Sequence, residues 1–229
     1  MAVDNRLLRI AGMIKQGSTV ADIGTDHAHL PVFLINEGKC EKVFACDVAD
    51  GPLKNARENI INAAVTGIEI RKGNGLNAVM PYEAETFVIA GMGGDLIAKI
   101  ISDAPWIKQE KYELILQPMT SVEDLRRYLC DEGFKITEEK VVNSIGRVYI
   151  IMKAVYCGKP LPCNDLFYYI GLLDKNMGDD EVKYIRRKLR IITKICKDIS
   201  NLETEKSRCE RLYKVVEQIK HILGEKDEH

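Results

Sequence analysis

Short apolar runs alternate with helical patterns along the first two thirds of the chain. Seven runs are predicted as strands, at residues 19–24, 42–48, 68–74, 86–94, 112–118, 134–142 and 147–156. Helical periodicity occupies 5–17, 30–38, 51–65, 94–102 and 121–133. Strands that alternate with helices predict a parallel sheet built from right-handed βαβ units. The near-continuous apolar character of 87–90 and 114–117 is typical of central strands buried on both faces.

The last two predicted strands follow a different pattern. They are joined by "NSIG" alone, which is too short for a crossover helix, so they should form an antiparallel hairpin. The chain is therefore expected to fold as an α/β, doubly wound domain over residues 1–157, with five parallel strands and a terminal antiparallel pair.

The C-terminal part carries helical patterns only. "KPLPCND", with two prolines in seven residues, predicts a linker, and residues 165–229 should form a second, helical unit. Apolar residues recur every seven positions, which favours two long helices packed as a coiled-coil hairpin with a turn near 200–203; a single kinked helix is the alternative. This seam consists of Ile195, Leu202, Cys209, Val216 and Leu223, extended by Leu212 and Ile219.

Composition narrows the class of protein. The net charge is −1 and 46% of residues are hydrophobic, so this is a globular chain in which any nucleic-acid contact must come from local clustering. The seven cysteines form no C-x-x-C pair and are expected to be mostly buried, reduced thiols. The N-terminus lacks the pattern of a signal peptide, and no apolar run approaches the ~20 residues of a membrane span. We expect a soluble cytoplasmic protein, and a monomer is favoured.

Candidate chemistry gathers where the predicted strands end. Ligands of doubly wound sheets bind at the carboxyl ends of the strands, where this chain places Gly, Asp or Asn four times. Cofactor contacts are therefore predicted at Asp22, Gly24, Thr25, Asp26, Asp47, Val48, Asn74, Gly75, Leu76, Ala90, Gly91 and Met92.

Asp47 and Asn74 indicate a nucleoside. A carboxylate at the end of the second strand is suited to accept hydrogen bonds from both hydroxyls of an adenosine ribose. The alternative is that Asp47 caps the following helix, a position that Asp50 could also fill. Asn74, between two glycines, offers a donor and an acceptor to the edge of an adenine.

The first strand end, "DIGTDHA", separates two cofactor classes. A dinucleotide site presents several glycines and no nearby anion to a pyrophosphate, whereas this turn places Asp22 and Asp26 around one glycine. Two carboxylates favour a cationic ligand without phosphate, such as S-adenosylmethionine with its sulfonium and ammonium groups. An NAD-dependent oxidoreductase remains the alternative in another enzyme class.

Five segments together resemble the bacterial tRNA (adenine-22-N1)-methyltransferase family: "VADIGTDHAHLP", "ACDVADGPLKNARENI", "GNGL", "IAGMGGDLI" and "LILQP". The resemblance runs from Arg6 to about Met152, and the helical extension is also similar. It implies a class I methyltransferase fold, S-adenosylmethionine as donor and tRNA as partner. Related sequences often have G-D-G-L where this chain has Asn74, which should adjust cofactor affinity rather than abolish binding.

The implied reaction needs few catalytic groups. Adenine N1 carries a lone pair and no proton, so positioning and charge stabilisation suffice. Asp26 is the leading candidate for stabilising the transferred charge, with His27 beside it, although His27 could equally be a hydrogen-bonded loop residue. The loop at Gly93 and Gly94 lacks an N-P-P-Y motif and could admit a flipped base. "DHAH" offers no evident third ligand, so no metal is expected.

A basic helix supplies the candidate RNA surface. Positive charge on a protruding helix suits phosphate contacts, although it could equally be a solvated face. Substrate contacts are predicted at Arg6, Lys183, Arg186, Arg187, Lys188 and Arg190. A non-catalytic RNA-binding module is the second alternative, and no membrane partner is expected.

Overall fold

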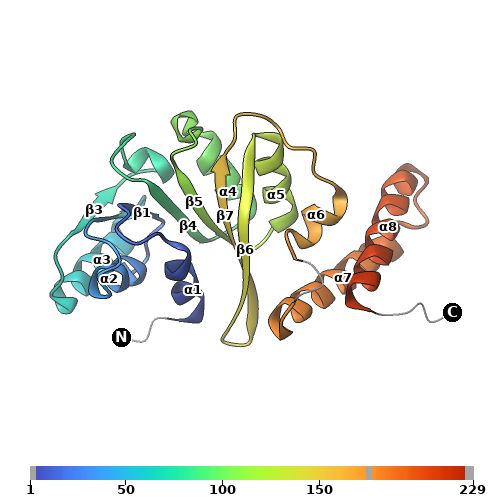
Figure 1. Cartoon of the computed structure of the whole chain (residues 1–229), viewed down its shortest axis with the longest axis horizontal. Helices are drawn as coiled ribbons and strands as arrows, with labels where there is room; N and C mark the ends of the chain where they lie inside the picture. The colour runs from blue at the N-terminus through green and yellow to red at the C-terminus, as the bar shows by residue number, and fades with distance from the viewer. Residues whose placement is uncertain (1–3, 174–176, 225–229) are drawn as a thin grey trace.

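A seven-stranded sheet forms the centre of the molecule (Figure 1). The structure, a computed structural model, describes residues 4–173 and 177–224. The strand order is β3-β2-β1-β4-β5-β7-β6, in which β1 to β5 are parallel and β7 runs antiparallel to both of its neighbours. The five parallel strands and the terminal antiparallel hairpin are thus confirmed. The strands are β1 (Val20–Ile23), β2 (Val43–Asp47), β3 (Ile68–Lys72), β4 (Thr86–Met92), β5 (Glu113–Pro118), β6 (Phe134–Ser144) and β7 (Arg147–Tyr156).

Helices cover both faces of this sheet. One face packs against α1 and α2, and α3 lies beside them over β2 and β3, whereas α4 and α5 cover the other face. Their bounds are α1 (Asn5–Met13), α2 (His29–Asn36), α3 (Asp50–Ala63), α4 (Gly94–Ser102) and α5 (Val122–Asp131), with 3-10 turns η1 (Gly75–Ala78) and η2 (Pro105–Ile107). Among the helices of the described residues, none is long and apolar enough to cross a membrane.

The two layers explain why the central strands read as continuous apolar runs. Along β4, Val88 faces the cluster of α1 and α2, while Phe87 and Ile89 face the cluster of α4 and α5. All three side chains are fully buried. Because both faces of the sheet are covered, successive residues must all be apolar, in contrast to the alternation of a half-exposed strand.

The C-terminal helices project to one side of the sheet (Figure 1). They are α6 (Asp165–Ile170), α7 (Asp179–Ile199) and α8 (Lys206–Leu223), with the 3-10 turn η3 (Glu203–Glu205) before α8. The predicted pair of long helices with a turn near 200–203 is confirmed, whereas α6 was not predicted. Cys209, Leu212, Val216 and Ile219 are buried as the seam requires, but Leu202 lies in the turn and is 51% exposed. Residues 225–229 of this unit lie outside the described residues.

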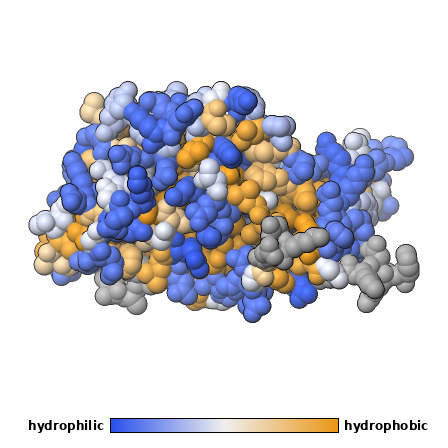
Figure 2. Space-filling model, in the orientation of Figure 1, coloured by the Kyte–Doolittle hydropathy of each residue, from blue (hydrophilic) through white to orange (hydrophobic). Residues whose placement is uncertain are grey.

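The helical extension shares its apolar core with the sheet domain. Ile185 and Ile192 of α7 belong to the same cluster as Leu125 and Leu129 of α5. Figure 2 shows hydrophobic side chains gathered where the C-terminal helices join the rest of the molecule, and hydrophilic ones over the far end of the extension. The extension is therefore packed onto the domain along its base.

A buried ion pair crosses the same junction. The side chains of Arg126 and Glu139 are both 0% exposed, and Arg126 Nε donates to Glu139 Oε1 at 2.8 Å. Arg126 Nη1 also donates to the carbonyl oxygens of Tyr168 and Tyr169, at 2.9 and 3.1 Å. The guanidinium thus connects α5 and β6 to the end of α6, which positions the extension.

Two cysteines depart from the expectation of reduced thiols. Cys130 at the end of α5 and Cys163 after β7 form a disulfide, with their Cα atoms 6.6 Å apart. The amide of Leu161 donates to the carbonyl of Cys130 at 2.9 Å, so the predicted linker follows the end of α5 closely. Cys40, Cys46, Cys157, Cys196 and Cys209 are free.

Candidate active site

The topology brings the four predicted strand ends together at one edge of the sheet. The amides of Gly24 and Thr25 donate to the carbonyl of Cys46 at 2.8 and 2.9 Å, so the first loop lies against the end of β2. The amide of Gly73 donates to the carbonyl of Asp47 at 3.0 Å, which places the third loop beside the second. Since β4 pairs with β1 on the other side, all four loops form one continuous surface.

Asp22 is a buried carboxylate at the centre of this surface. Asp22 is only 8% exposed, and this burial raises the pKa of its carboxyl from 3.8 to about 6. The Asp47 carboxylate raises this pKa further, whereas the Thr25 hydroxyl and the Arg6 guanidinium oppose the shift. A carboxyl that burial makes costly to ionise is suited to meet a cationic ligand, which would favour its charged form.

Asp47 holds its own loop in shape. Its Oδ1 accepts the amide hydrogen of Ala49 at 2.8 Å. The helix α3 begins at Asp50 after the cap residue Ala49, and its N-terminus receives no side-chain cap, so Asp47 is not its N-cap. Asp50 instead forms an ion pair with Lys72 at 2.8 Å. The second carboxylate oxygen of Asp47 thus stays available to a ligand.

The loop after β3 leaves Asn74 exposed. Asn74 precedes η1, and its side chain forms no capping hydrogen bond there. Val48, from the loop after β2, is also exposed. Leu76 differs, because its side chain is 1% exposed and belongs to the core under α4. Because the Leu76 side chain is buried, the predicted contact between Leu76 and a cofactor could involve only the backbone of this residue.

Gln117 organises the loop after β4, and it was missed in the sequence. It is fully buried, and its Oε1 accepts from the amide of Gly91 at 3.1 Å and from Arg6 Nη1 at 2.9 Å. The pairing of β4 with β5 shifts register between Ala90 and Met92, so Gly91 with φ of +78° forms a bulge. The signal was present, because Gln117 is a polar residue at the end of an apolar strand.

The tight turn at Gly24 brings the first and fourth loops into contact. Gly24 has φ of +82°, and a Cβ there would clash with Cε of Met92. The thioether of Met92 therefore lies over the Gly24 backbone. The positive φ is what requires a glycine here, since the Met92 side chain is flexible and could move away from a Cβ.

The two glycines predicted to admit the substrate base have different surroundings. A Cβ on Gly93 would lie 3.0 Å from Oγ1 of Thr120, and Gly93 is partly exposed. Gly94 is buried, and a Cβ there would clash with the backbone oxygen of Ser121. Gly94 thus allows α4 to begin against the loop after β5. We reassign it from substrate contact to helix packing, whereas Gly93 stays a candidate.

Asp26 and His27 lie together on the loop between β1 and α2. Asp26 Oδ2 is 3.6 Å from His27 Nε2, and the Asp26 side chain is 75% exposed. The ring of His27 stacks on that of His29, with centroids 5.3 Å apart. Between them Ala28 is fully buried with φ of +52°, an uncommon conformation for a residue other than glycine.

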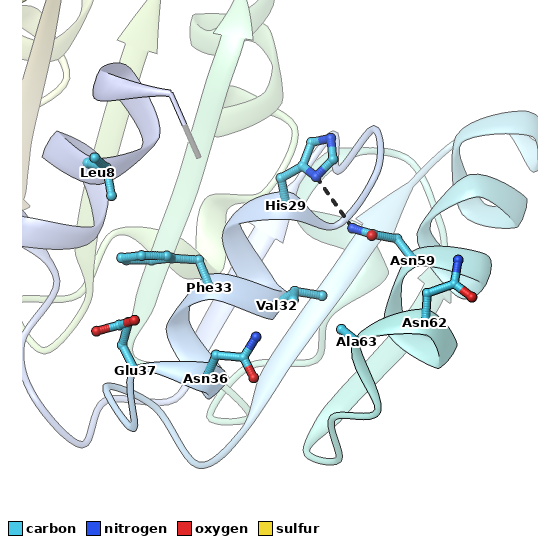
Figure 3. Close-up of a pocket in the computed structure, with 9 residues that line it drawn as sticks. All are labelled: Leu8, His29, Val32, Phe33, Asn36, Glu37, Asn59, Asn62 and Ala63. Carbon is cyan, nitrogen blue, oxygen red and sulfur yellow. Dashed lines mark hydrogen bonds between the residues drawn. The ribbon is translucent and has the colours of Figure 1, made fainter. Parts of the chain in front are cut away.

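Asn59 of α3 fixes this loop from outside. Its Nδ2 donates to the carbonyl oxygen of His27 at 2.8 Å and lies 3.4 Å from Nδ1 of His29 (Figure 3). Burial and the neighbouring His27 lower the pKa of His29. No sequence pattern marks Asn59, because it lies in the middle of a helix 32 positions from its partner.

A groove of about 580 Å³ opens beside Asn59, between α1, α2 and α3. Val32 and Asn36 point toward α3, while Leu8 and Phe33 lie on the other side of α2 (Figure 3). The groove reaches the first loop at His29 and is not formed by the strand-end residues. It is thus separate from the candidate cofactor surface.

The basic residues of α7 divide into two groups. Lys183, Arg186, Arg187 and Arg190 are exposed. Lys188 is 8% exposed, and its Nζ lies 2.5 Å from Oε1 of Glu123 at the start of α5. We therefore reassign Lys188 from RNA contact to the junction between α7 and the sheet domain, since its charge is already paired.

The site contains carboxylates without a metal cluster. Within residues 4–173 and 177–224, no group of three His, Cys, Asp or Glu side chains is arranged to hold a metal ion. The surface instead joins a buried acid, a half-buried acid, an exposed amide and a thioether at neighbouring strand ends. These features, on a parallel sheet that ends in an antiparallel hairpin, define a Rossmann-like fold of the methyltransferase class.

Comparisons with known proteins agree with this class. A family profile described as "Methyltransferase domain" matches residues 3–152, and the chain belongs to this family. The chain is 32% identical over 155 residues to the tRNA (adenine(22)-N(1))-methyltransferase of Bacillus subtilis. That match covers 67% of this chain and 65% of the relative, slightly less than two thirds of its length.

Two solved structures extend the likeness to the C-terminal helices. The B. subtilis m1A22 tRNA methyltransferase TrmK superimposes with a TM-score of 0.84 at 28% identity, covering 97% of this chain and 99% of that one. A Streptococcus pneumoniae protein described as a putative tRNA (m1A22) methyltransferase, in complex with S-adenosyl-L-methionine, gives 0.80 at 28% identity, covering 97% and 100%.

Proposed function

We propose that this chain is an S-adenosylmethionine-dependent tRNA methyltransferase that methylates N1 of adenine 22. The observation that carries the proposal is the pair of carboxylates, Asp22 and Asp47, at adjacent strand ends beside a turn with a single glycine. The name of the B. subtilis relative and the S-adenosyl-L-methionine complex of the S. pneumoniae neighbour support it. A tRNA substrate is also consistent with a cytoplasmic location.

The residues present fit this cofactor. Asp47 offers a carboxylate oxygen to ribose hydroxyls, and the exposed amide of Asn74 can pair with the edge of adenine. Asp22 can balance the positive charge of the ligand, because a nearby cation favours the charged form of a carboxyl whose pKa burial has raised to about 6. A pyrophosphate would be repelled by the same two acids, which disfavours a dinucleotide.

The chemistry requires positioning more than proton transfer. S-adenosylmethionine supplies an electrophilic methyl group, which adenine N1 attacks with its lone pair as the carbon–sulfur bond breaks. The transferred positive charge ends on the adenine ring, and we assign its stabilisation to the exposed carboxylate of Asp26. Gly93 leaves space for the base, and Asn59 keeps the loop of Asp26 and His27 in place.

We assign the two parts of the chain different tasks. Residues 1–157 carry every proposed cofactor contact, and residues 165–229 add affinity for RNA. The exposed cations of α7 would contact phosphates, which attract protein without reading sequence. The chain contributes these contacts through Lys183, Arg186, Arg187 and Arg190, with Arg6 near the mouth of the site.

Methylation of an unmodified tRNA transcript in vitro tests the proposal. A methyl group on N1 blocks Watson–Crick pairing, so primer extension should stop at position 22. A transcript with guanine at position 22 is the matched control and should show no new stop. A stop at another position would refute the substrate assignment.

Two alternatives predict other results. A non-catalytic RNA-binding module would bind the transcript and transfer no methyl group from labelled donor. An oxidoreductase would bind NAD tightly in calorimetry and would not bind S-adenosylhomocysteine. Either outcome would replace the proposal.

A further inference from the structure

A cleft separates the end of β5 from the terminal hairpin. Pairing between β5 and β7 ends at Leu116 and Met152, whereas β5 continues to Pro118 in pairing with β4. The hairpin of β6 and β7 continues to Ser144 and Arg147, and it extends beyond the other strands in Figure 1. An open cleft of about 750 Å³ lies between the residues that follow β5 and the end of the hairpin, and α7 lines its third side.

This cleft begins where the candidate active site ends. Its wall at Met119 and Thr120 is joined to the loop after β4, since the amide of Met119 donates to the carbonyl of Met92 at 2.7 Å. The hydroxyl of Thr120 borders Gly93, which we propose faces the substrate base. A polymer whose reacting base lies at Gly93 could therefore continue directly into the cleft.

The charges lining the cleft favour a polyanion. Arg147 of the hairpin and Arg187 of α7 are both exposed, and within the described part of the chain neither side chain takes part in an ion pair or a hydrogen bond. Glu123 is an acidic residue of the lining, and Lys188 neutralises it. Arg147 and Arg187 thus leave the cleft with net positive charge.

The lining also offers surface to bases. Met119 and Ile191 are 44% and 42% exposed, and Val148 is partly exposed on the same face of the hairpin as the α7 contacts. Exposed apolar side chains next to arginines suit a single-stranded nucleic acid, whose bases can contact the apolar side chains while its phosphates contact the cations.

We propose that this cleft binds the RNA strand next to the acceptor adenosine, with phosphates at Arg147 and Arg187. The inference rests on the proposed function and adds to it a path for the substrate. It also gives α7 a defined contact face, formed by Arg187 and Ile191, in place of a general attraction by all its cations.

The test compares two double variants with the same change in net charge. Arg147→Gln with Arg187→Gln removes the free cations of the cleft, whereas Lys194→Gln with Lys197→Gln removes two exposed cations from another face of α7. We would measure the Kd of an unmodified tRNA transcript against salt, the kcat and KM of methylation, and the Kd of S-adenosylmethionine.

The cleft variant should raise the tRNA Kd on the order of tenfold, because two charge-assisted phosphate contacts are lost. Its slope of log K against log salt should fall by about two. The control should raise Kd only about two- to threefold through long-range attraction. Cofactor affinity should not change in either variant, since neither pair lies at the carboxyl ends of β1 to β4, where the proposed cofactor contacts are.

Equal effects of the two double variants on the tRNA Kd, or a larger effect of the control, would refute the proposal that RNA binds in the cleft. A second pair excludes a folding artefact: Ile191→Glu adds one negative charge inside the cleft, and Thr193→Glu adds one on the other face. The first should weaken tRNA binding more than the second. Because binding is measured apart from turnover, a wild-type protein that binds tRNA but does not methylate it would refute the function and still test the cleft.

Discussion

Replacing Asp22 by asparagine should stabilise the protein without cofactor while weakening cofactor binding. Burial raises the pKa of this carboxyl from 3.8 to about 6, a shift of roughly two units. At about 1.4 kcal/mol per unit, ionising Asp22 in the protein without cofactor costs about 3 kcal/mol of folding stability. Asparagine has the same shape and no charge, so Asp22→Asn removes this cost.

The contribution of Asp22 to folding stability depends on pH, and it is destabilising once the carboxyl must ionise. Below about pH 4 the carboxyl is protonated in both the folded and the unfolded chain, so it contributes no difference. Between about pH 4 and pH 6 the unfolded chain loses the proton while the folded chain keeps it, and stability falls as pH rises. Above about pH 6 the full cost is present. The difference in free energy of unfolding between Asp22→Asn and the wild-type protein should thus increase by about 3 kcal/mol, in favour of the variant, as the pH rises from about 4 to about 6.

Urea unfolding at several pH values measures this difference, because the other titrating groups are common to both proteins and cancel. A difference that does not change with pH would refute the reasoning, since Asp22 would then ionise normally. Calorimetry tests the second part of the prediction, the weaker binding of the cofactor. Wild-type affinity for S-adenosylmethionine should rise from about pH 5 to pH 7 as Asp22 becomes charged, and Asp22→Asn should lose this dependence.

Substitutions at Asp47, Asn59 and Arg126 test the cofactor pocket, the loop of His27 and the buried ion pair, respectively. Asp47→Asn keeps an acceptor for its own loop and should weaken S-adenosylmethionine binding by about 1.5–3 kcal/mol in calorimetry, whereas Asp50→Asn, on an exposed side chain, should have no effect; equal losses would remove Asp47 from the pocket. Asn59→Ala should lower kcat with little change in cofactor Kd, because the His27 loop loses its anchor, while Asn62→Ala in the adjacent groove should match wild type. Arg126→Ala should cost about 3–5 kcal/mol in urea unfolding, since it leaves a buried carboxylate without its partner; a loss under about 1 kcal/mol would contradict this.

The sequence specified most of the sheet and its reactive edge. Apolar runs that end at Gly, Asp or Asn predicted the five parallel strands, and the four-residue "NSIG" connection predicted the antiparallel pair. Asp22, Asp47 and Asn74 followed from one rule, that ligands bind at the carboxyl ends of parallel strands. This worked because backbone pairing and periodicity are local properties, and a parallel sheet aligns its strand ends once its strands are known.

Contacts between distant segments were decided only by the tertiary structure. Lys188 belongs to a regular basic pattern, yet the packing of α7 on α5 buries it against Glu123. Gly94 reads as part of an open glycine loop, but the approach of the Ser121 backbone makes it a packing residue. Asn59 carries no signal at all, because its role depends on a carbonyl 32 positions away. Periodicity records which side of an element is buried, whereas the identity of the neighbour depends on how elements far apart in the chain come together.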